Sequence, residues 1–466
     1  MDVPGLAVAV IRDQEIIMAE GFGYRDVEAG LEVTPETIFA IGSTTKAFTA
    51  MAAGILADEG KLDLDTPVKN YLPQFKMFDS FATERVTLRD LLCHRTGLPR
   101  HDQMWYNSSL SREEIIERLQ YLEPNTEFRA SWQYQNIMYM LAGYIAGHQL
   151  GTSWEQVIQD KIFHPLQMEA SNLSVDVSQQ QSNYALPYID QGNLLQRIAF
   201  RNIDLIGPAG SINSNILDMV KWLMLHLGQG TYKGSQIISA GNLAEMHKPH
   251  MPTESWVTQE MPMCCYGLGW CIEPYRGHQM IHHNGGIDGF TAEVAFAPNE
   301  KIGIVILSNK NGSPLPRIIR HNLFDRLLGL EVIDWSGRMR GGKENEQENQ
   351  EEPNQSEKVE NVQEKEKSPE PDTLPSHQLH AYTGTYSHPG YGELVIEFVD
   401  DQLQVVYNDI PLLLTRMNQH AFELEYKVFG TKTSATFYTD VNNQIDRVAV
   451  KMLFEPGTKD IEFVKK

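Results

Sequence analysis

The pattern of apolar and polar positions divides the chain into three stretches, the first of which runs to residue 335. Near both ends of this stretch, alternating or short apolar runs predict strands, and apolar positions on a helical period predict helices between them. Such segregation is typical of an α+β fold in which the first and last strands lie side by side in one antiparallel sheet, flanked by helices and joined to a helical subdomain. The predicted strands are 5–12, 15–21, 266–272, 279–283, 291–296 and 302–308, and the predicted helices are 44–59, 112–121, 135–149, 153–163, 215–227 and 314–329.

Capping boxes indicate where two of these helices begin. Ser111 is followed three residues later by Glu114, and Thr152 by Glu155. In such a pair the hydroxyl accepts a backbone N–H of the first turn, and the acidic side chain accepts the N–H of the capping residue. We expect helices to start directly after Ser111 and Thr152.

The second stretch, residues 336–375, has almost no apolar residues. Within it, residues 341–372 hold eleven acidic residues and four lysines. A segment of this composition buries too little apolar surface to offset the entropy of an ordered chain. We predict a disordered, extended acidic linker here, with an acidic interaction segment as the alternative.

The third stretch, residues 376–466, returns to a globular composition. Short strand-like runs alternate with Asp- and Asn-rich turns, which is typical of a small antiparallel barrel or sandwich. This stretch holds no cluster of chemically reactive side chains, so we expect it to form a separate all-β domain without catalytic residues. Its predicted strands are 393–399, 403–407, 421–426, 434–438 and 445–452.

Charge and composition narrow the range of partners. The net charge of −22 argues against nucleic acid, since phosphates need lysine and arginine for neutralisation. No apolar run reaches the roughly 18 residues that a membrane span needs. The chain enters a strand without a basic, then apolar, leader, which favours a cytoplasmic protein, or a periplasmic or secreted one if a leader has been lost.

The cysteines and histidines do not show the spacing of a metal site. The four cysteines form no C-x-x-C pair, so neither a zinc site nor a disulfide framework is indicated. Pro249 disrupts a helical pairing of His247 with His250. His282 and His283 are adjacent, so on a strand they point to opposite faces. We therefore predict no metal and no cofactor.

The strongest chemical signal is Ser43-Thr44-Thr45-Lys46 at the start of an Ala-rich helix. Residues three apart share one helical face, so the Lys46 amine can reach the Ser43 hydroxyl. If burial keeps the amine neutral, Lys46 can take the proton and leave an attacking alkoxide. Ser-x-x-Lys alone is weak evidence, because about two matches are expected by chance in a chain of this length.

Two further segments add groups suited to the same chemistry. A phenol such as that of Tyr134 can relay a proton beside a Ser/Lys pair, and the Asn136 amide can bind both a lysine and a substrate carbonyl. His283 is followed by Asn284, Gly285 and Gly286, and glycines there let the backbone come close to a ligand. Taken singly, each residue is also compatible with ordinary packing.

Together these segments resemble the serine β-lactamase-like superfamily, in the branch of class C β-lactamases, D-Ala-D-Ala carboxypeptidases, D-aminopeptidases and related esterases. The tail, with YTGTY at 382–386, resembles the lipocalin-like barrel that follows some of these hydrolases. The resemblance implies a β-lactamase/transpeptidase-like fold followed by a small all-β barrel. The segments that carry it are VPGLAVAV (3–10), STTK (43–46), LLCHRTGLP (91–99), YQN (134–136), PAG (208–210) and HNGG (283–286).

The resemblance also implies roles. Ser43 would be the nucleophile, Lys46 its base and Tyr134 the proton relay to the leaving group. Asn136, His283 and Gly285 would contact the substrate. The N–H groups of Ser43 and Gly286 would form the oxyanion hole.

Two departures from the family bear on substrate and packing. Related β-lactamases carry Lys-Thr-Gly where this chain has His283-Asn284-Gly285. A histidine is mostly neutral at pH 7 and lacks the fixed cation for a carboxylate, which favours substrates that are neutral or have a free N-terminus. The helix that usually precedes the first strand is missing, so we expect Leu6, Val8 or Val10 to be partly uncovered.

The sequence thus favours a serine hydrolase that acts through an acyl-enzyme on amide bonds, including those of D-amino-acid peptides, or on esters. One alternative is a carboxylesterase or acyltransferase without peptidase activity. Another is a catalytically silent, penicillin-binding-like sensor or scaffold. The expected partner is a small-molecule or peptide substrate, and a homo-oligomer remains open.

Overall fold

The computed structural model describes residues 3–191, 194–253, 258–339, 377–426 and 431–466. Most of the predicted linker therefore lies outside the described residues. Its first four positions, 336–339, instead continue a helical turn that begins at Trp335. Trp335, the last residue of the predicted first domain, is buried, and its indole N–H donates to the Asp325 carboxylate at 2.8 Å. Met339, in the turn that follows, packs partly buried against the same apolar cluster.

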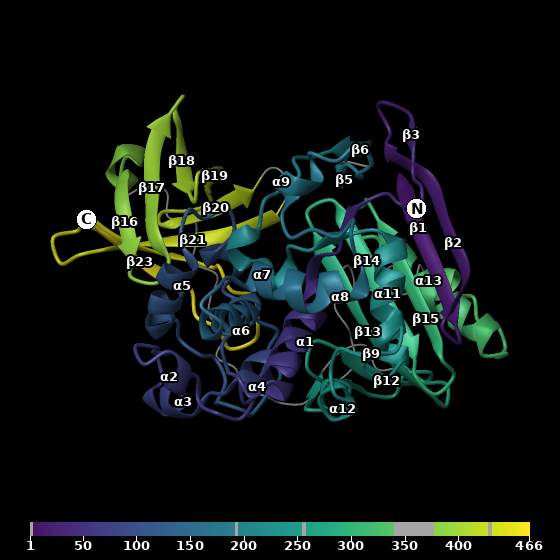
Figure 1. Cartoon of the computed structure of the whole chain (residues 1–466). Coiled ribbons are helices and arrows are strands. Elements are labelled where there is room, and N and C mark those ends of the chain that lie inside the picture. The colour runs from purple at the N-terminus through teal and green to yellow at the C-terminus, as the bar shows by residue number, and fades with distance from the viewer. Residues whose placement is uncertain (1–2, 192–193, 254–257, 340–376, 427–430) are drawn as a thin grey trace, which may run out of the picture.

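The core of the first domain is a nine-stranded antiparallel sheet in the order β10-β11-β12-β13-β14-β15-β1-β2-β3 (Figure 1). The first and last long strands, β1 and β15, pair directly, which confirms the α+β topology expected from the sequence. Its strands are β1 (Gly5–Arg12), β2 (Glu15–Asp26), β3 (Leu31–Glu32), β10 (Met251–Thr253), β11 (Cys264–Tyr266), β12 (Cys271–Tyr275), β13 (His278–Ile287), β14 (Phe290–Ala297) and β15 (Ile302–Ser308).

One predicted strand, 266–272, is wrong. The structure divides it into the ends of β11 and β12, joined by a tight turn through Gly269 at φ +79°. A Cβ at Gly269 would lie 2.8 Å from the Cα of Ala47, so this turn presses against the helix that follows Ser43. A tertiary contact therefore decides the break, and strand periodicity alone does not reveal it.

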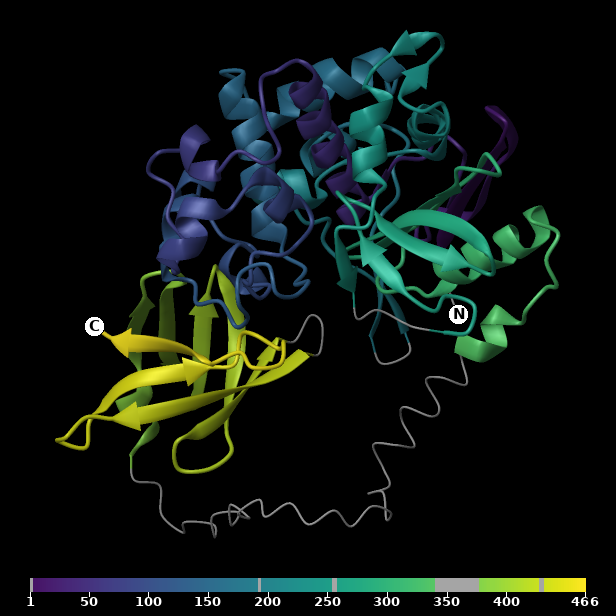
Figure 2. The same ribbon diagram turned by 90° about the horizontal axis from the view of Figure 1, so that it is seen from below.

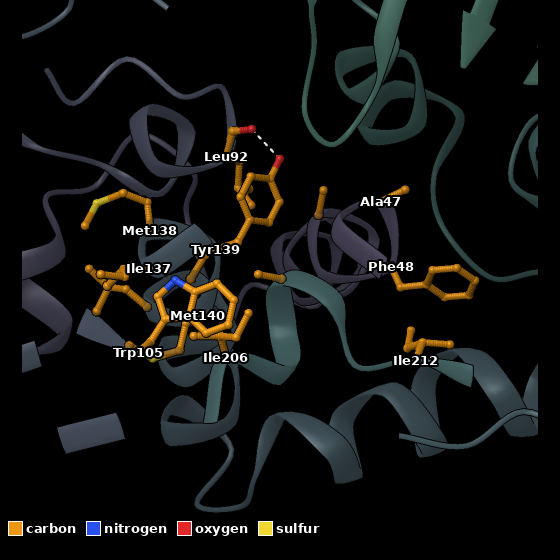
Figure 3. Packing of buried hydrophobic residues seen from close by; sticks show 14 of the residues in the cluster. Ala47, Phe48, Leu92, Trp105, Ile137, Met138, Tyr139, Met140, Ile206 and Ile212 are labelled. Atoms are coloured by element: carbon orange, nitrogen blue, oxygen red, sulfur yellow. Dashed lines mark hydrogen bonds between the residues drawn. The ribbon is translucent and has the colours of Figure 1, made fainter. Parts of the chain in front are cut away.

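A buried helix, α1 (Thr45–Asp58), runs through the centre of the domain, between the sheet and the helical subdomain. It packs against α6 (Asn136–Gln149), where Tyr139 lies between the two helices and donates its hydroxyl to the Leu92 carbonyl (Figure 3). The other α-helices are α2 (Val68–Tyr71), α3 (Ser80–Arg85), α4 (Leu88–Leu92), α5 (Arg112–Arg118), α7 (Trp154–Ile158), α8 (His164–Leu166), α9 (Val175–Ser178), α10 (Gly207–Gly210), α11 (Ile216–Leu227), α12 (Ala240–Met246) and α13 (Leu315–Leu327).

Of the two predicted capping boxes, only the first forms. Ser111 and Glu114 make both capping bonds at the start of α5. The second prediction is wrong by one residue, since Ser153 caps α7 by accepting the Gln156 N–H at 3.2 Å. The N–H of Thr152 is already bonded to the Gly147 carbonyl at 3.0 Å, so Thr152 still belongs to the turn that ends α6.

The sheet face that was expected to be partly uncovered is in fact covered. Leu6, Val8 and Val10 are buried in an apolar layer with α13 and the segment after it, including Phe324 and Trp335. The C-terminal helix of the domain, α13, thus covers this face of the sheet. Among the described residues, no helix is long and apolar enough to cross a membrane.

In the described part of the tail, strands β16 to β23 form a closed antiparallel barrel, which confirms the all-β prediction (Figure 2). Barrel closure comes from pairing of the first strand with the last, and neither strand was predicted. The strands are β16 (Gly384–His388), β17 (Gly392–Val399), β18 (Gln402–Tyr407), β19 (Ile410–Arg416), β20 (Ala421–Tyr426), β21 (Thr431–Thr439), β22 (Ile445–Val450) and β23 (Ile461–Lys465).

The barrel packs against the helical subdomain around residues 100–125 (Figure 2). Asn408 donates to the carbonyls of Gln103 and Tyr106 at 3.0 and 3.1 Å. His101 and the Tyr391 hydroxyl, both buried, lie 2.7 Å apart. These contacts bring one wall of the barrel next to the loop that carries Arg100.

Candidate active site

Ser43 lies in a 3₁₀ turn, Gly42–Thr44, that leads directly into α1. The strand β13 passes very close to this turn: a Cβ at Gly285 would lie 1.9 Å from the Ile41 carbonyl oxygen, and one at Gly42 would lie 2.8 Å from the Gly286 nitrogen. Only glycine fits such an approach. The backbone of Gly286 is thereby held beside Ser43.

The Lys46 side chain is fully buried and has three polar neighbours. Its Nζ lies 2.8 Å from Asn136 Oδ1, 2.8 Å from the Ala209 carbonyl and 3.1 Å from Ser43 Oγ. The first two are oxygens that only accept hydrogen bonds. A neutral amine has two N–H donors and one lone pair, so with both donors used, the lone pair is left facing the Ser43 hydroxyl.

The surroundings of Lys46 favour this neutral form. Burial lowers its pKa well below 10.5, and the nearby Arg100 charge lowers it further, whereas Asp102 opposes them. Within the described part of the chain, no carboxylate lies within ion-pair distance of Nζ. An amine without a counter-ion in a buried site loses its proton readily.

Asp102 determines how the Asn136 amide is oriented. Asn136 Nδ2 donates to Asp102 Oδ1 at 2.9 Å, so the amide oxygen must face Lys46. The same carboxylate accepts Trp105 Nε1 at 2.8 Å and Arg100 Nε at 2.7 Å. Asp102 is therefore a positioning residue that the sequence interpretation missed.

Tyr134 lies between the Ser/Lys pair and Arg100. Its ring centroid is 4.6 Å from Lys46 Nζ and 5.1 Å from Arg100 Cζ. Burial raises the pKa of its phenol, while a hydrogen bond with Ser43 and the Arg100 charge oppose that shift. The phenol stays protonated at neutral pH and contacts the nucleophile.

His283 lies behind these groups. It is 2% exposed, and its ring centroid is 6.5 Å from that of Tyr134. Nδ1 must donate to the Asn284 carbonyl at 2.6 Å, so Nε2 accepts from the Tyr266 hydroxyl at 2.9 Å. Burial, with a contribution from Lys46, lowers the pKa of His283 to about 3. The ring is neutral and both nitrogens are already bonded.

A cavity of about 600 Å³ opens beside Ser43 and lies between the two domains. Ser43, Asn136 and Gly286 line one side. The barrel lines the other with mostly apolar side chains: Tyr407, Ile410, Leu412, Leu424, Tyr426, Val450, Met452 and Phe454. The sequence predicted no catalytic role for the barrel, and it did not indicate that the barrel forms a wall of this cavity.

The structure brings together Ser43, Lys46, Tyr134, Asn136, Gly285, Gly286 and His283, all of them sequence candidates. It adds Arg100, Asp102, His94 and Tyr266, which the sequence interpretation missed. A signal was present for three of them, because His94 lies inside the motif at 91–99, and Arg100 and Asp102 follow within three residues of its end. Within the described residues, no three His, Cys, Asp or Glu side chains gather as a metal site.

The sheet, the helical subdomain and the serine-lysine turn between them define a protein of the β-lactamase and penicillin-binding-protein class. The chain belongs to the β-lactamase family, whose model matches residues 1–327. A second family model, described as a domain of unknown function (DUF3471), matches residues 368–465, which include the barrel.

Two curated proteins and one solved structure illustrate what the chain is similar to. The chain is 29% identical over 431 residues to the unguisins hydrolase of Aspergillus campestris, covering 87% of this chain and 77% of the relative. It is 25% identical over 330 residues to protein flp of Staphylococcus aureus strain MW2, covering 68% and 62%. Among solved structures, it matches the octameric penicillin-binding protein homologue from Pyrococcus abyssi with a TM-score of 0.63 and 25% identity, over 99% and 96% of the two chains.

Proposed function

We propose that this protein is a serine hydrolase that cleaves amide or ester bonds through an acyl-enzyme on Ser43. The observation that carries the proposal is the buried Lys46 amine, whose two donors are used by Asn136 and Ala209 and whose lone pair is left for the Ser43 hydroxyl. The hydrolase among its relatives supports the same class of reaction.

In the first step, Ser43 Oγ attacks the substrate carbonyl while its proton passes to Lys46 Nζ. The backbone N–H groups of Ser43 and Gly286 bind the developing oxyanion, an effect worth about 10²–10³ in kcat for each donor. Tyr134, in contact with Ser43, donates its phenolic proton to the leaving amine or alcohol and takes a proton back from the Lys46 ammonium. The leaving group departs, and Lys46 is neutral again. In the second step, water attacks the ester on Ser43 while Lys46 Nζ takes its proton. The Oγ–acyl bond breaks, the acid departs, and Lys46 returns the proton to Ser43 Oγ.

The barrel wall favours a substrate with apolar groups. Apolar side chains of β18, β19 and β20 face the cavity beside Ser43, so a bulky apolar part of the substrate would contact the barrel while its carbonyl reaches Ser43. Peptides and esters of this kind remain equal candidates. The alternative of a catalytically silent sensor would keep acylation but not turnover.

Covalent labelling tests the proposal. A fluorophosphonate should add one adduct to the peptide that contains Ser43, and Ser43→Ala should abolish it. Ser235→Ala, at an exposed strand residue, is the matched control and should label normally. Turnover is then measured on D-amino-acid peptides, 4-nitrophenyl esters and a chromogenic cephalosporin. An adduct elsewhere would refute the nucleophile, and labelling without any turnover would favour the sensor.

A homo-oligomer is a further part of the proposal, because the Pyrococcus abyssi homologue is described as octameric. Light scattering on the purified protein measures the mass directly. A monomeric mass at micromolar concentration would refute the homo-oligomer and leave the proposed hydrolase mechanism intact.

A further inference from the structure

Arg100 is a cation on the wall of the Ser43 cavity, and the mechanism above gives it no bond to the substrate. Its side chain is 49% exposed and lines the cavity together with Ser43 and Asn136. His283, which stands where the related β-lactamases carry a lysine, is neutral and fully bonded. Any fixed positive charge for a substrate must therefore come from another residue.

Two contacts hold the guanidinium of Arg100, and a third holds its backbone. Nε donates to Asp102 Oδ2 at 2.7 Å, and Cζ lies 5.1 Å from the Tyr134 ring centroid. The backbone N–H of Arg100 donates to Glu455 Oε1 of the barrel at 2.9 Å. In the described part of the chain, neither terminal NH₂ group has a hydrogen-bond partner. A fixed planar fork with free donors matches a carboxylate in bidentate geometry.

In the part of the chain that the structure describes, the acidic side chains that line the cavity are already hydrogen-bonded, whereas two of its basic side chains still have free N–H donors. Asp288 is already bonded to Arg201 Nε at 2.6 Å and to the Tyr106 hydroxyl. Asp102 is used by Arg100, Trp105 and Asn136, as described above. Lys451, which the barrel contributes to the wall, has no partner for its amine among the described residues. The anions are thus engaged, whereas the cations have donors to offer.

We infer that Arg100 is a binding site for a carboxylate of the substrate, so that this hydrolase selects substrates with an anionic group near the scissile bond. The inference rests on the proposed function of Ser43 and narrows its substrate class. It replaces the expectation, drawn from His283, that neutral substrates are favoured.

Matched substrate pairs test the inference. The first pair is the mono-4-nitrophenyl ester of glutaric acid and its terminal carboxamide, which places the charge on the acyl side. The second pair is a chromogenic peptide with a free C-terminus and its amide, which places the charge on the leaving side. We expect kcat/KM to favour the acid about tenfold or more in at least one pair. The preference should disappear in Arg100→Gln and partly survive in Arg100→Lys.

The ratio within a pair separates this role from an effect on Lys46. Removing the Arg100 charge changes the pKa of Lys46 equally for both members, so the ratio cancels that effect. Arg85→Gln, at an exposed arginine stacked on Phe81, is the control and should leave every ratio unchanged. An acid-to-amide ratio that is the same in wild type and Arg100→Gln for both pairs would overturn the inference.

A binding experiment keeps the inference testable if hydrolysis is absent. In the Ser43→Ala protein, affinities for glutarate monoamide and glutaramide are measured by calorimetry, with and without Arg100→Gln. Tighter binding of the acid that is lost in Arg100→Gln supports the site even if Ser43 proves inactive. Equal affinities in both proteins refute the site while leaving the hydrolase proposal intact.

Discussion

His282 and His283 are neighbours on β13, yet they lie on opposite faces of the sheet and in opposite electrostatic environments. His283 lies on the Ser43 side of the sheet, behind Tyr134 and beside Tyr266, and burial lowers its pKa to about 3. His282 faces α13, with Glu273 and Glu293 at 3.2 and 3.4 Å. Burial and Arg320 lower its pKa, but the two glutamates outweigh them and raise it to about 9. The same side chain is thus neutral on one face and charged on the other.

The comparison shows that the two faces of one sheet have different roles: one carries the candidate catalytic groups, and the other carries buried ion pairs. The Ser43 face keeps Lys46 and His283 uncharged, which a general base requires. The α13 face pairs buried charges, with Arg320 NH1 2.7 Å from Glu293 Oε1. We expect variants on the first face to change activity and variants on the second to change the free energy of unfolding.

The largest effect is expected at Lys46. Lys46→Ala removes the general base and should lower kcat by about 10²–10⁴-fold with the fold retained. In the wild type, kcat/KM should rise along one ionisation well below pH 10.5, because the lowered pKa supplies free base there. Lys61→Ala, at an exposed lysine, is the control. Steady-state kinetics and circular dichroism measure both, and a nearly active Lys46→Ala would contradict the role.

On the opposite face, Arg320→Met removes the arginine of the buried Arg320–Glu293 pair and leaves Glu293 with His282 alone. Breaking a buried pair in this way costs about 3–5 kcal/mol. Urea unfolding should show that loss, while fluorophosphonate labelling of Ser43 in the folded protein continues. Lys432→Met, which breaks a more exposed pair with Glu423 in the barrel, should cost much less, because solvent screens an exposed pair. Equal costs for the two variants would mean that the α13 face has no special charge network.

The raised pKa of His282 predicts a pH dependence of stability. A proton held more tightly in the folded state contributes stability that is complete below about pH 6.5 and lost as the pH rises through about 9. Unfolding free energies at pH 7 and 10 should therefore differ more in wild type than in His282→Asn, by on the order of 2 kcal/mol. A His282 pKa below 6.5 by NMR would show that the nearby Arg320, rather than the glutamates, sets its charge.

The smallest effect is expected at Asp102, which acts through Asn136 and Lys46. Asp102→Asn weakens the orientation of the Asn136 amide and should lower kcat about tenfold. Because the Asp102 charge raises the pKa of Lys46, its loss should also move the acid limb of kcat/KM to lower pH. A purely structural role would not move that limb. Asp176→Asn, at an exposed residue of α9, serves as the control.

Local sequence determined a good part of this molecule. The spacing of Ser43 and Lys46 places them on one face of a helix, since i and i+3 are neighbours there, and the two atoms do lie 3.1 Å apart. A short apolar run gave the bounds of β15, and the two-residue side-chain period of a strand put His282 and His283 on opposite faces. The Ser111–Glu114 box gave the start of α5. Each of these features depends on residues that lie close together in the sequence.

Tertiary structure decided the rest, because it depends on groups far apart in the sequence. Burial lowers the pKa of Lys46, and the carbonyl of Ala209 and the amide of Asn136 use its donors. Helix α13, near the C-terminal end of the first domain, covers Leu6 at the N-terminal end of the same domain. One wall of the Ser43 cavity is formed by barrel strands, whose residues follow the nucleophile by more than 350 positions in the sequence. No local pattern encodes such distances, since they follow from how the sheet, the helices and the barrel pack together.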